Sequence, residues 1–233
     1  MARIYLVLGS FAVSLLIANF GVGIWVGDLN GVADRMQHEA QQYKVARGNG
    51  EQGAIDDARE SMLAASAELT PIKKRHGIHF LLGVLSALVC VLVNGIAMTY
   101  FIGSSKWCSE VVDTYSLDLS YLRKSRTLKR RAYPWTISGV AAIVAIVAFG
   151  AASDPATQIE SSASWVTPHM IVAIVGTMWL IVSFLNQAGL IGAHYDVINE
   201  IVAAVEVRRA EIGQADAEQI ESLEESTSLE IDE

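Results

Sequence analysis

The chain has 233 residues, of which 52% are apolar and 18% are charged, with a formal net charge of −8. A typical soluble domain is about 25% charged, so this composition excludes an ordinary water-soluble domain and indicates a membrane protein. The charge is unevenly distributed along the chain. Residues 103–134 hold seven basic and three acidic side chains, whereas residues 193–233 hold two basic and twelve acidic ones.

Four stretches contain no Asp, Glu, Lys or Arg: residues 4–26, 78–102, 135–152 and 169–192. The shortest, 135–152, would form a helix of about 27 Å, close to the bilayer core of about 30 Å. We therefore predict an all-α integral membrane protein, a four-transmembrane-helix bundle whose helices extend beyond the bilayer. The first stretch exceeds the apolar region of a secretory signal, about 7 to 15 residues, which predicts an uncleaved anchor.

The aqueous segments between the spans are predicted to be helical as well. The first loop has two helical arms, 32–47 and 54–69, joined by the breaker Gly48-Asn49-Gly50 and closed before Pro71. The last residues, from 215 onward, hold eight acids and no base and are predicted to form a solvated, disordered tail. The predicted segments are the first transmembrane helix 1–27, an extracytoplasmic helical hairpin 28–77, the second transmembrane helix 78–102, a cytoplasmic basic helical loop 103–134, the third transmembrane helix 135–152, a short outer loop 153–168, the fourth transmembrane helix 169–192, and a cytoplasmic helix extension with acidic tail 193–233.

The distribution of basic residues predicts the topology. The loop 103–134 is basic and the loop 153–168 has no Lys or Arg, so the positive-inside rule places both termini in the cytoplasm. Lys73, Lys74 and Arg75, at the outer end of the second span, are the exception, but charges in a long loop weigh less in this rule. We expect the protein in a bacterial cytoplasmic membrane.

A basic run precedes the third span. Beside the bilayer, its side chains are expected to bind anionic lipid headgroups, each contributing about 1 kcal/mol. Fixing the topology is the alternative role of the same residues. Nucleic-acid binding is not expected, because the adjacent membrane competes for the charges. The run consists of Arg123, Lys124, Arg126, Lys129, Arg130 and Arg131.

Two histidines head the second and fourth spans. In the predicted topology both spans begin on the outer side, so His79 and His169 lie at similar depth. Two imidazoles at matching depth on neighbouring helices are what axial ligation of a b-type haem requires, and Gly83 and Ala173, four residues deeper, would leave room for the macrocycle. The alternative for both histidines is a purely interfacial position.

Other histidines extend or limit this hypothesis. His76 is close enough in sequence to join His79 and Glu160 in a non-haem metal site. His194, at the opposite end of the fourth span, has no counterpart in another span, so a second haem is not expected.

No catalytic motif occurs in the chain, and no Asp, Glu, Lys or Arg lies within a span. We therefore expect a non-enzymatic scaffold, anchor or accessory subunit of a membrane complex, with no cofactor and with a protein partner or a second copy of itself bound to the outer hairpin. The first alternative is a cytochrome b-like electron-transfer subunit with haem b on His79 and His169. The second alternative is a pore or small-solute transporter.

Overall fold

The computed structural model describes residues 2–157, 159 and 161–231, and this part of the chain is helical with no strand. Two short 3-10 turns lie in the loop before the last helix. The elements are α1 (Ala2–Val26), α2 (Leu29–Asn49), α3 (Gln52–Thr114), α4 (Leu119–Ser153), η1 (Pro155–Thr157), η2 (Ser162–Trp165) and α5 (Val166–Ile231).

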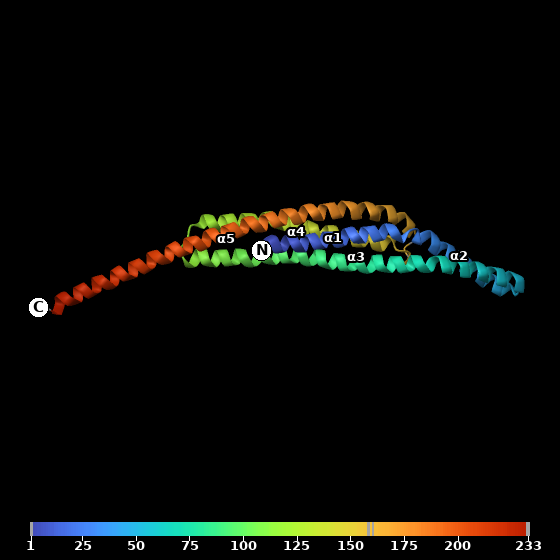
Figure 1. Cartoon of the computed structure of the whole chain (residues 1–233), viewed down its shortest axis with the longest axis horizontal. Helices are drawn as coiled ribbons and strands as arrows, with labels where there is room; N and C mark the ends of the chain where they lie inside the picture. The colour runs from blue at the N-terminus through green and yellow to red at the C-terminus, as the bar shows by residue number, and fades with distance from the viewer. Residues whose placement is uncertain (1, 158, 160, 232–233) are drawn as a thin grey trace.

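Helices α1, α3, α4 and α5 form an antiparallel bundle (Figure 1). Each of α1 and α4 packs against both α3 and α5, which lie diagonally opposite each other with few contacts. Helix α2 packs along the first part of α3 and projects with it from one end of the bundle. We call this the hairpin end, and the opposite end, where α3 turns into α4, the terminal end.

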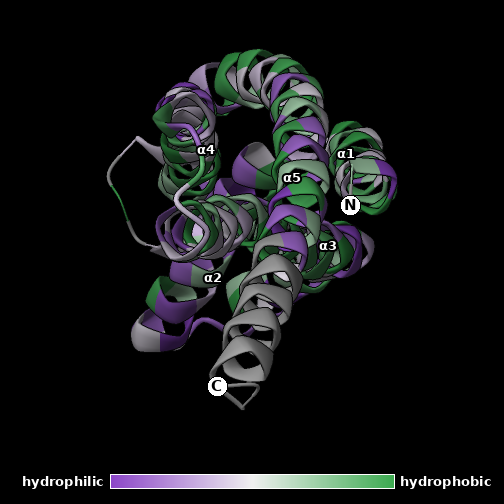
Figure 2. Ribbon diagram, turned by 90° about the vertical axis from the view of Figure 1, so that its left-hand side faces the viewer, coloured by the Kyte–Doolittle hydropathy of each residue, from purple (hydrophilic) through white to green (hydrophobic). Residues whose placement is uncertain are grey.

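All four bundle helices are long and apolar enough to cross a membrane, as the sequence predicts. Their outward faces are apolar: Val7, Leu81 and Val144 are 69%, 68% and 61% exposed. Figure 2 shows hydrophobic residues along the outside of the helices as well as between them. A soluble monomer rarely exposes so extensive an apolar surface, whereas lipid covers it without cost.

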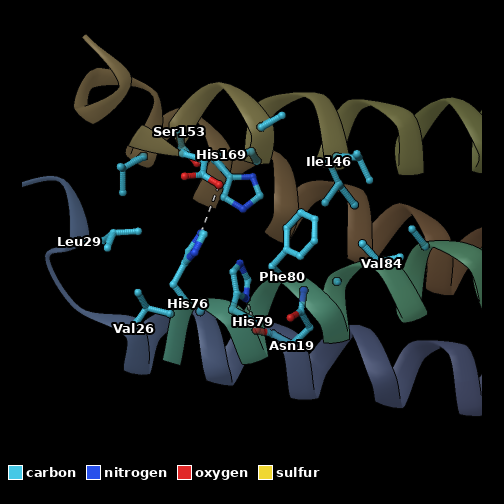
Figure 3. A pocket seen from close by; sticks show the side chains of 18 of the residues that line it. Asn19, Val26, Leu29, His76, His79, Phe80, Val84, Ile146, Ser153 and His169 are labelled. Carbon is cyan, nitrogen blue, oxygen red and sulfur yellow. Dashed lines mark hydrogen bonds and ion pairs between the residues drawn. The ribbon is translucent and has the colours of Figure 1, made fainter. Parts of the chain in front are cut away.

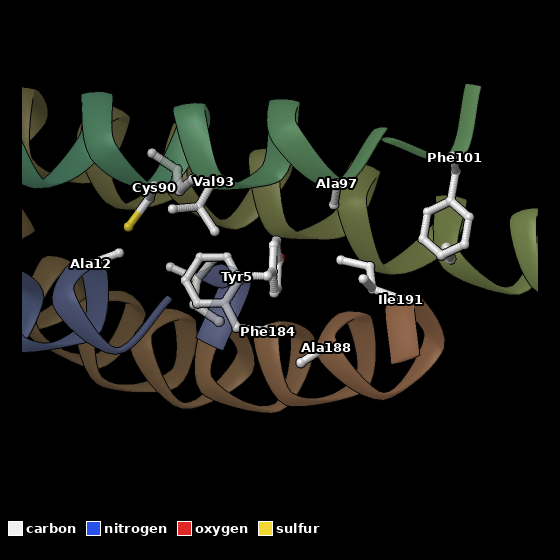
Figure 4. Close-up of a cluster of buried hydrophobic side chains, with 12 residues drawn as sticks. Tyr5, Ala12, Cys90, Val93, Ala97, Phe101, Phe184, Ala188 and Ile191 are labelled. Carbon is white, nitrogen blue, oxygen red and sulfur yellow. The ribbon is translucent and has the colours of Figure 1, made fainter. Parts of the chain in front are cut away.

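The centre of the bundle is closely packed (Figure 4). Small side chains such as Ala12, Cys90 and Ala97 are fully buried and let the helices approach one another. Tyr5 and Phe184 fill the space between α1 and α5 in an edge-to-face contact with ring centroids 6.3 Å apart. This cluster joins residues of α1, α3, α4 and α5 in one core.

Pro71 and Pro134 lie inside helices, whereas the sequence predicts a segment boundary near each of them. The second hairpin arm does not close before Pro71, because α3 continues through it into the second span. Helix α4 likewise passes through Pro134 into the third span. A proline removes one backbone hydrogen bond, and near Pro71 the Thr70 hydroxyl donates to the carbonyl of Ser66 within the same helix. The hairpin is therefore continuous with the bundle.

The turns at the hairpin end use residues suited to them. Gly27 and Gly50 have φ values of 81° and 76°, in the left-handed region that favours glycine. Between α1 and α2, the Asp28 side chain accepts a hydrogen bond from the backbone N–H of Gly31 and caps α2. The first arm thus begins at Leu29 rather than at residue 32.

At the terminal end, α3, α4 and α5 continue past their uncharged stretches. Cys108, Val112, Val197 and Ile201 are buried there as a second apolar cluster. Helix α5 then extends to Ile231 (Figure 1), whereas the sequence predicts a disordered tail from residue 215. Residues 215–231 hold five Glu, two Ala and two Leu, which are strong helix formers despite the clustered negative charge.

Candidate functional site

A cavity of about 710 Å³ opens at the hairpin end of the bundle (Figure 3). It lies between α1, α3 and α4, with the first turn of α5 and the start of α2 at its rim. Phe80, Val84 and Ile146 form apolar walls, and polar groups are few. Its volume lies within the range of about 300 to 1,000 Å³ typical of small-molecule and cofactor sites.

His79 of α3 and His169 of α5 both line this cavity. Their ring centroids are 6.4 Å apart and their ring planes are inclined by 67°. Helices α3 and α5 lie diagonally opposite each other, so the imidazoles approach each other across the bundle. The structure therefore brings together His79 and His169, the two residues that the sequence predicts to lie at similar depth in the membrane.

Each of these imidazoles packs against a glycine of a neighbouring helix. A Cβ atom on Gly23 of α1 would lie 2.9 Å from Cε1 of His79, and one on Gly150 of α4 would lie 3.1 Å from Cε1 of His169. Both rings thus occupy space that any larger residue would take. Neither glycine is near its histidine in the sequence, since only the tertiary arrangement brings them together.

The orientation of His79 is fixed by a backbone hydrogen bond. Its Nδ1 lies 3.1 Å from the carbonyl oxygen of Asn19 in α1. A carbonyl only accepts, so Nδ1 carries the proton and donates, which leaves Nε2 with a lone pair. A hydrogen bond of this kind on the second ring nitrogen is typical of histidines that ligate a metal.

Two polar atoms of the cavity lining are buried without a hydrogen-bond partner among the described residues. They are Nδ1 of His169 and the side-chain oxygen Oδ1 of Asn19. In the part of the chain that the structure describes, Tyr5 holds the one other such atom. Buried polar atoms are almost always paired, so two unpaired atoms on one cavity indicate a place for a bound ligand or ordered water.

His76, which the sequence makes a candidate for a metal site, lies at the rim of the cavity. Its Nε2 lies 3.6 Å from Oδ2 of Asp154 across the rim of the cavity. Glu160, the third residue of that predicted site, lies outside the described residues. Among residues 2–157, 159 and 161–231, no three His, Cys, Asp or Glu side chains are grouped closely enough to hold one metal ion.

The space beside the histidines differs in detail from the sequence-based expectation. Gly83 lines the cavity, but the amide nitrogen Nδ2 of Asn19 would be 3.1 Å from a Cβ placed there. Ala173 is not among the residues that line the cavity. The free volume beside the imidazoles is therefore bounded by α1, α3 and α4.

His194 lies far from this cavity, at the terminal end, and is fully buried. Its Nε2 is 2.9 Å from the hydroxyl of Ser125, and its Nδ1 is 3.4 Å from the hydroxyl of Tyr100. Ser125 in turn donates to Ser105. These partners come from α3 and α4, so His194 joins three helices by hydrogen bonds instead of facing a cavity.

The basic run occupies the first part of α4. Arg123, Lys124, Arg126, Arg130 and Arg131 are exposed and Lys129 is half-buried. Lys124 is 2.6 Å from Glu200 of α5, and this hydrogen bond raises the pKa of Lys124. At the start of the helix, Asp118 accepts a hydrogen bond from the backbone N–H of Ser120, which lowers the pKa of Asp118.

No protein-family model, curated protein or solved structure matches the chain. The cavity therefore has to be interpreted from its own chemistry. It offers two imidazoles facing each other, a mainly apolar lining and unpaired buried polar atoms.

Proposed function

We propose that this chain is an integral membrane electron-transfer subunit that binds one b-type haem between His79 and His169. The observation that carries the proposal is the separation of their ring centroids, 6.4 Å. Two imidazoles on opposite faces of one iron, with metal–nitrogen bonds of about 2 Å, have ring centroids about 6 Å apart. The separation of the two centroids is thus close to that of two axial ligands.

The surroundings of the two rings support this ligand. The backbone carbonyl of Asn19 keeps the Nε2 lone pair of His79 available. Nδ1 of His169 has no hydrogen-bond partner among the described residues, although the His169 ring also lies within reach of the backbone carbonyl of Ile146. Apolar walls suit a large planar macrocycle, and the glycines beside the rings leave room for both imidazoles.

Bis-histidine ligation favours electron transfer over other haem chemistry. A bound haem would supply a one-electron couple, and His79 and His169 would both be engaged in holding it. The protein residues would then act by holding the iron's ligands, excluding water and setting the polarity around them.

A reduced-minus-oxidised absorption spectrum of the purified full chain tests the proposal. We expect a sharp haem α band that is lost in His79→Ala and in His169→Ala. His38→Ala is the matched control, because His38 lies on the exposed hairpin and interacts with Gln42 there. A spectrum unchanged in both ligand variants would refute the assignment.

A scaffold or accessory subunit of a membrane complex is the second candidate. The hairpin of α2 and α3 favours it, since Val45 and Leu63 are 54% and 55% exposed well away from the apolar spans. Affinity purification in mild detergent tests this role. A co-purifying protein lost in Val45→Asp/Leu63→Asp would support it, and an identical set of proteins from wild type and variant would contradict it.

A further inference from the structure

The basic run of α4 stands directly above a lipid-facing surface. Arg130, Ile137 and Val144 are spaced by seven residues, which is nearly two helical turns, so they lie along one stripe of the helix. Arg126 is three turns before Ile137 and shares that stripe. Ile137 and Val144 are 58% and 61% exposed, and both arginines are exposed as well.

The arginines on this stripe have no acidic partner among the described residues. Helix α4 contains no Asp or Glu, and of its six basic residues Lys124 is the one that forms an ion pair in the part of the chain the structure describes. Glu200, the acid that approaches this region from α5, is engaged by Lys124. Arg126 and Arg130 thus present uncompensated positive charge.

Both arginines lie on the aqueous side of the uncharged stretch of α4. Trp135 begins the uncharged stretch and packs against Trp179 of α5, with ring centroids 5.4 Å apart. At 1.5 Å per residue, Arg130 lies about 8 Å and Arg126 about 14 Å before Trp135 along the helix axis. A headgroup layer is about 5 to 8 Å thick, so Arg130 lies at its outer edge and Arg126 about 6 Å beyond it, a distance that a long arginine side chain can span.

From this arrangement we infer a specific site for an anionic phospholipid on α4. The headgroup phosphate binds Arg126 and Arg130, and an acyl chain lies along Ile137 and Val144. Lys124 does not take part, because its ammonium group is bound to Glu200. This site is independent of haem binding, since it lies on the outside of the bundle near the terminal end.

Native mass spectrometry of the full chain in detergent, titrated with phosphatidylglycerol or phosphatidylcholine, tests the site. Wild type should bind phosphatidylglycerol at least about tenfold more tightly than phosphatidylcholine. Arg126→Gln/Arg130→Gln should lose this preference, whereas Arg126→Lys/Arg130→Lys should retain most of it. If the double Gln variant does not fold, Arg130→Gln alone should lose a smaller part of the preference.

Lys44→Gln/Arg59→Gln is the matched control, because it removes two exposed charges from the hairpin and should leave the preference intact. Inorganic phosphate should not displace the lipid at equal concentration, because it cannot contact Ile137 and Val144. Equal binding of both lipids, retention of the preference in the Gln variants, or displacement by phosphate would overturn the proposed site.

Discussion

The imidazoles of His79 and His169, carried by diagonally opposed helices, face each other with their ring centroids 6.4 Å apart. The position of each ring depends on residues of neighbouring helices. Gly23 and Gly150 make room for the rings, and the carbonyl of Asn19 orients His79. The proposed haem site therefore depends on residues that would not bind the cofactor themselves.

Gly23→Ala should weaken haem binding by about tenfold or more without unfolding the protein. The added Cβ would lie 2.9 Å from Cε1 of His79, so the ring must move away from its ligand position. Gly21→Ala is the control, because a Cβ there meets nothing within 4 Å. Haem titration of both variants checks the prediction, and equal affinities would show that the glycine does not position the ring.

Gly139→Ala should lower the stability of the bundle by about 1 to 2 kcal/mol. A Cβ on Gly139 would lie 2.7 Å from Oδ1 of Asn94, the atom that accepts a hydrogen bond from Gln187. Gly95→Ala introduces the same methyl group where nothing lies within 4 Å. Thermal unfolding in detergent should separate the two variants, and identical midpoints would argue against a structural role for the Asn94–Gln187 bond.

His194→Ala should destabilise the terminal end by about 2 kcal/mol or more, because it leaves a cavity and removes the partner of Ser125 and Tyr100. It should not alter a haem spectrum, since His194 is remote from the cavity at the hairpin end. Tyr195→Ala, at a half-exposed neighbouring position, should have a smaller effect. Loss of the haem bands in His194→Ala would contradict the assignment of ligands.

Asp118 should make the start of α4 sensitive to acid. Its pKa is lowered in the folded chain by the hydrogen bond from the backbone N–H of Ser120. This stabilisation is fully present above the unfolded pKa, about 3.9, and is lost as the pH falls through the lower folded value. Asp118→Asn keeps a capping side chain that does not titrate. The wild type should therefore exceed Asp118→Asn in unfolding temperature by more at pH 7 than at pH 3; a constant difference would contradict the prediction.

The sequence was sufficient to locate the apolar helices and to place His79 and His169 at matching depth. The length of an uncharged stretch and the helical spacing of its residues are local properties, so they can be recognised without knowledge of the fold. Continuity through Pro71 was not predictable from propensity, because packing between α2 and α3 compensates for one lost hydrogen bond. Extension of α5 to Ile231 likewise depends on helix propensity outweighing clustered charge.

The cavity itself depended on tertiary contacts that a single sequence does not reveal. Gly23 and Gly150 resemble ordinary small residues of membrane helices until each is seen beside an imidazole. The pairing of His76 with Asp154 and the burial of His194 are of the same kind. In each case the partner comes from another helix, at a separation that local periodicity does not encode.

Titration of the purified full chain with haemin, followed by its absorption spectrum, is the decisive experiment for the proposed haem site. We expect saturation at one haem per chain with the spectrum of a bis-histidine low-spin iron, and loss of that spectrum in both His79→Ala and His169→Ala. Featureless, non-saturating uptake by the wild type, or an identical low-spin spectrum in the two variants, would contradict it.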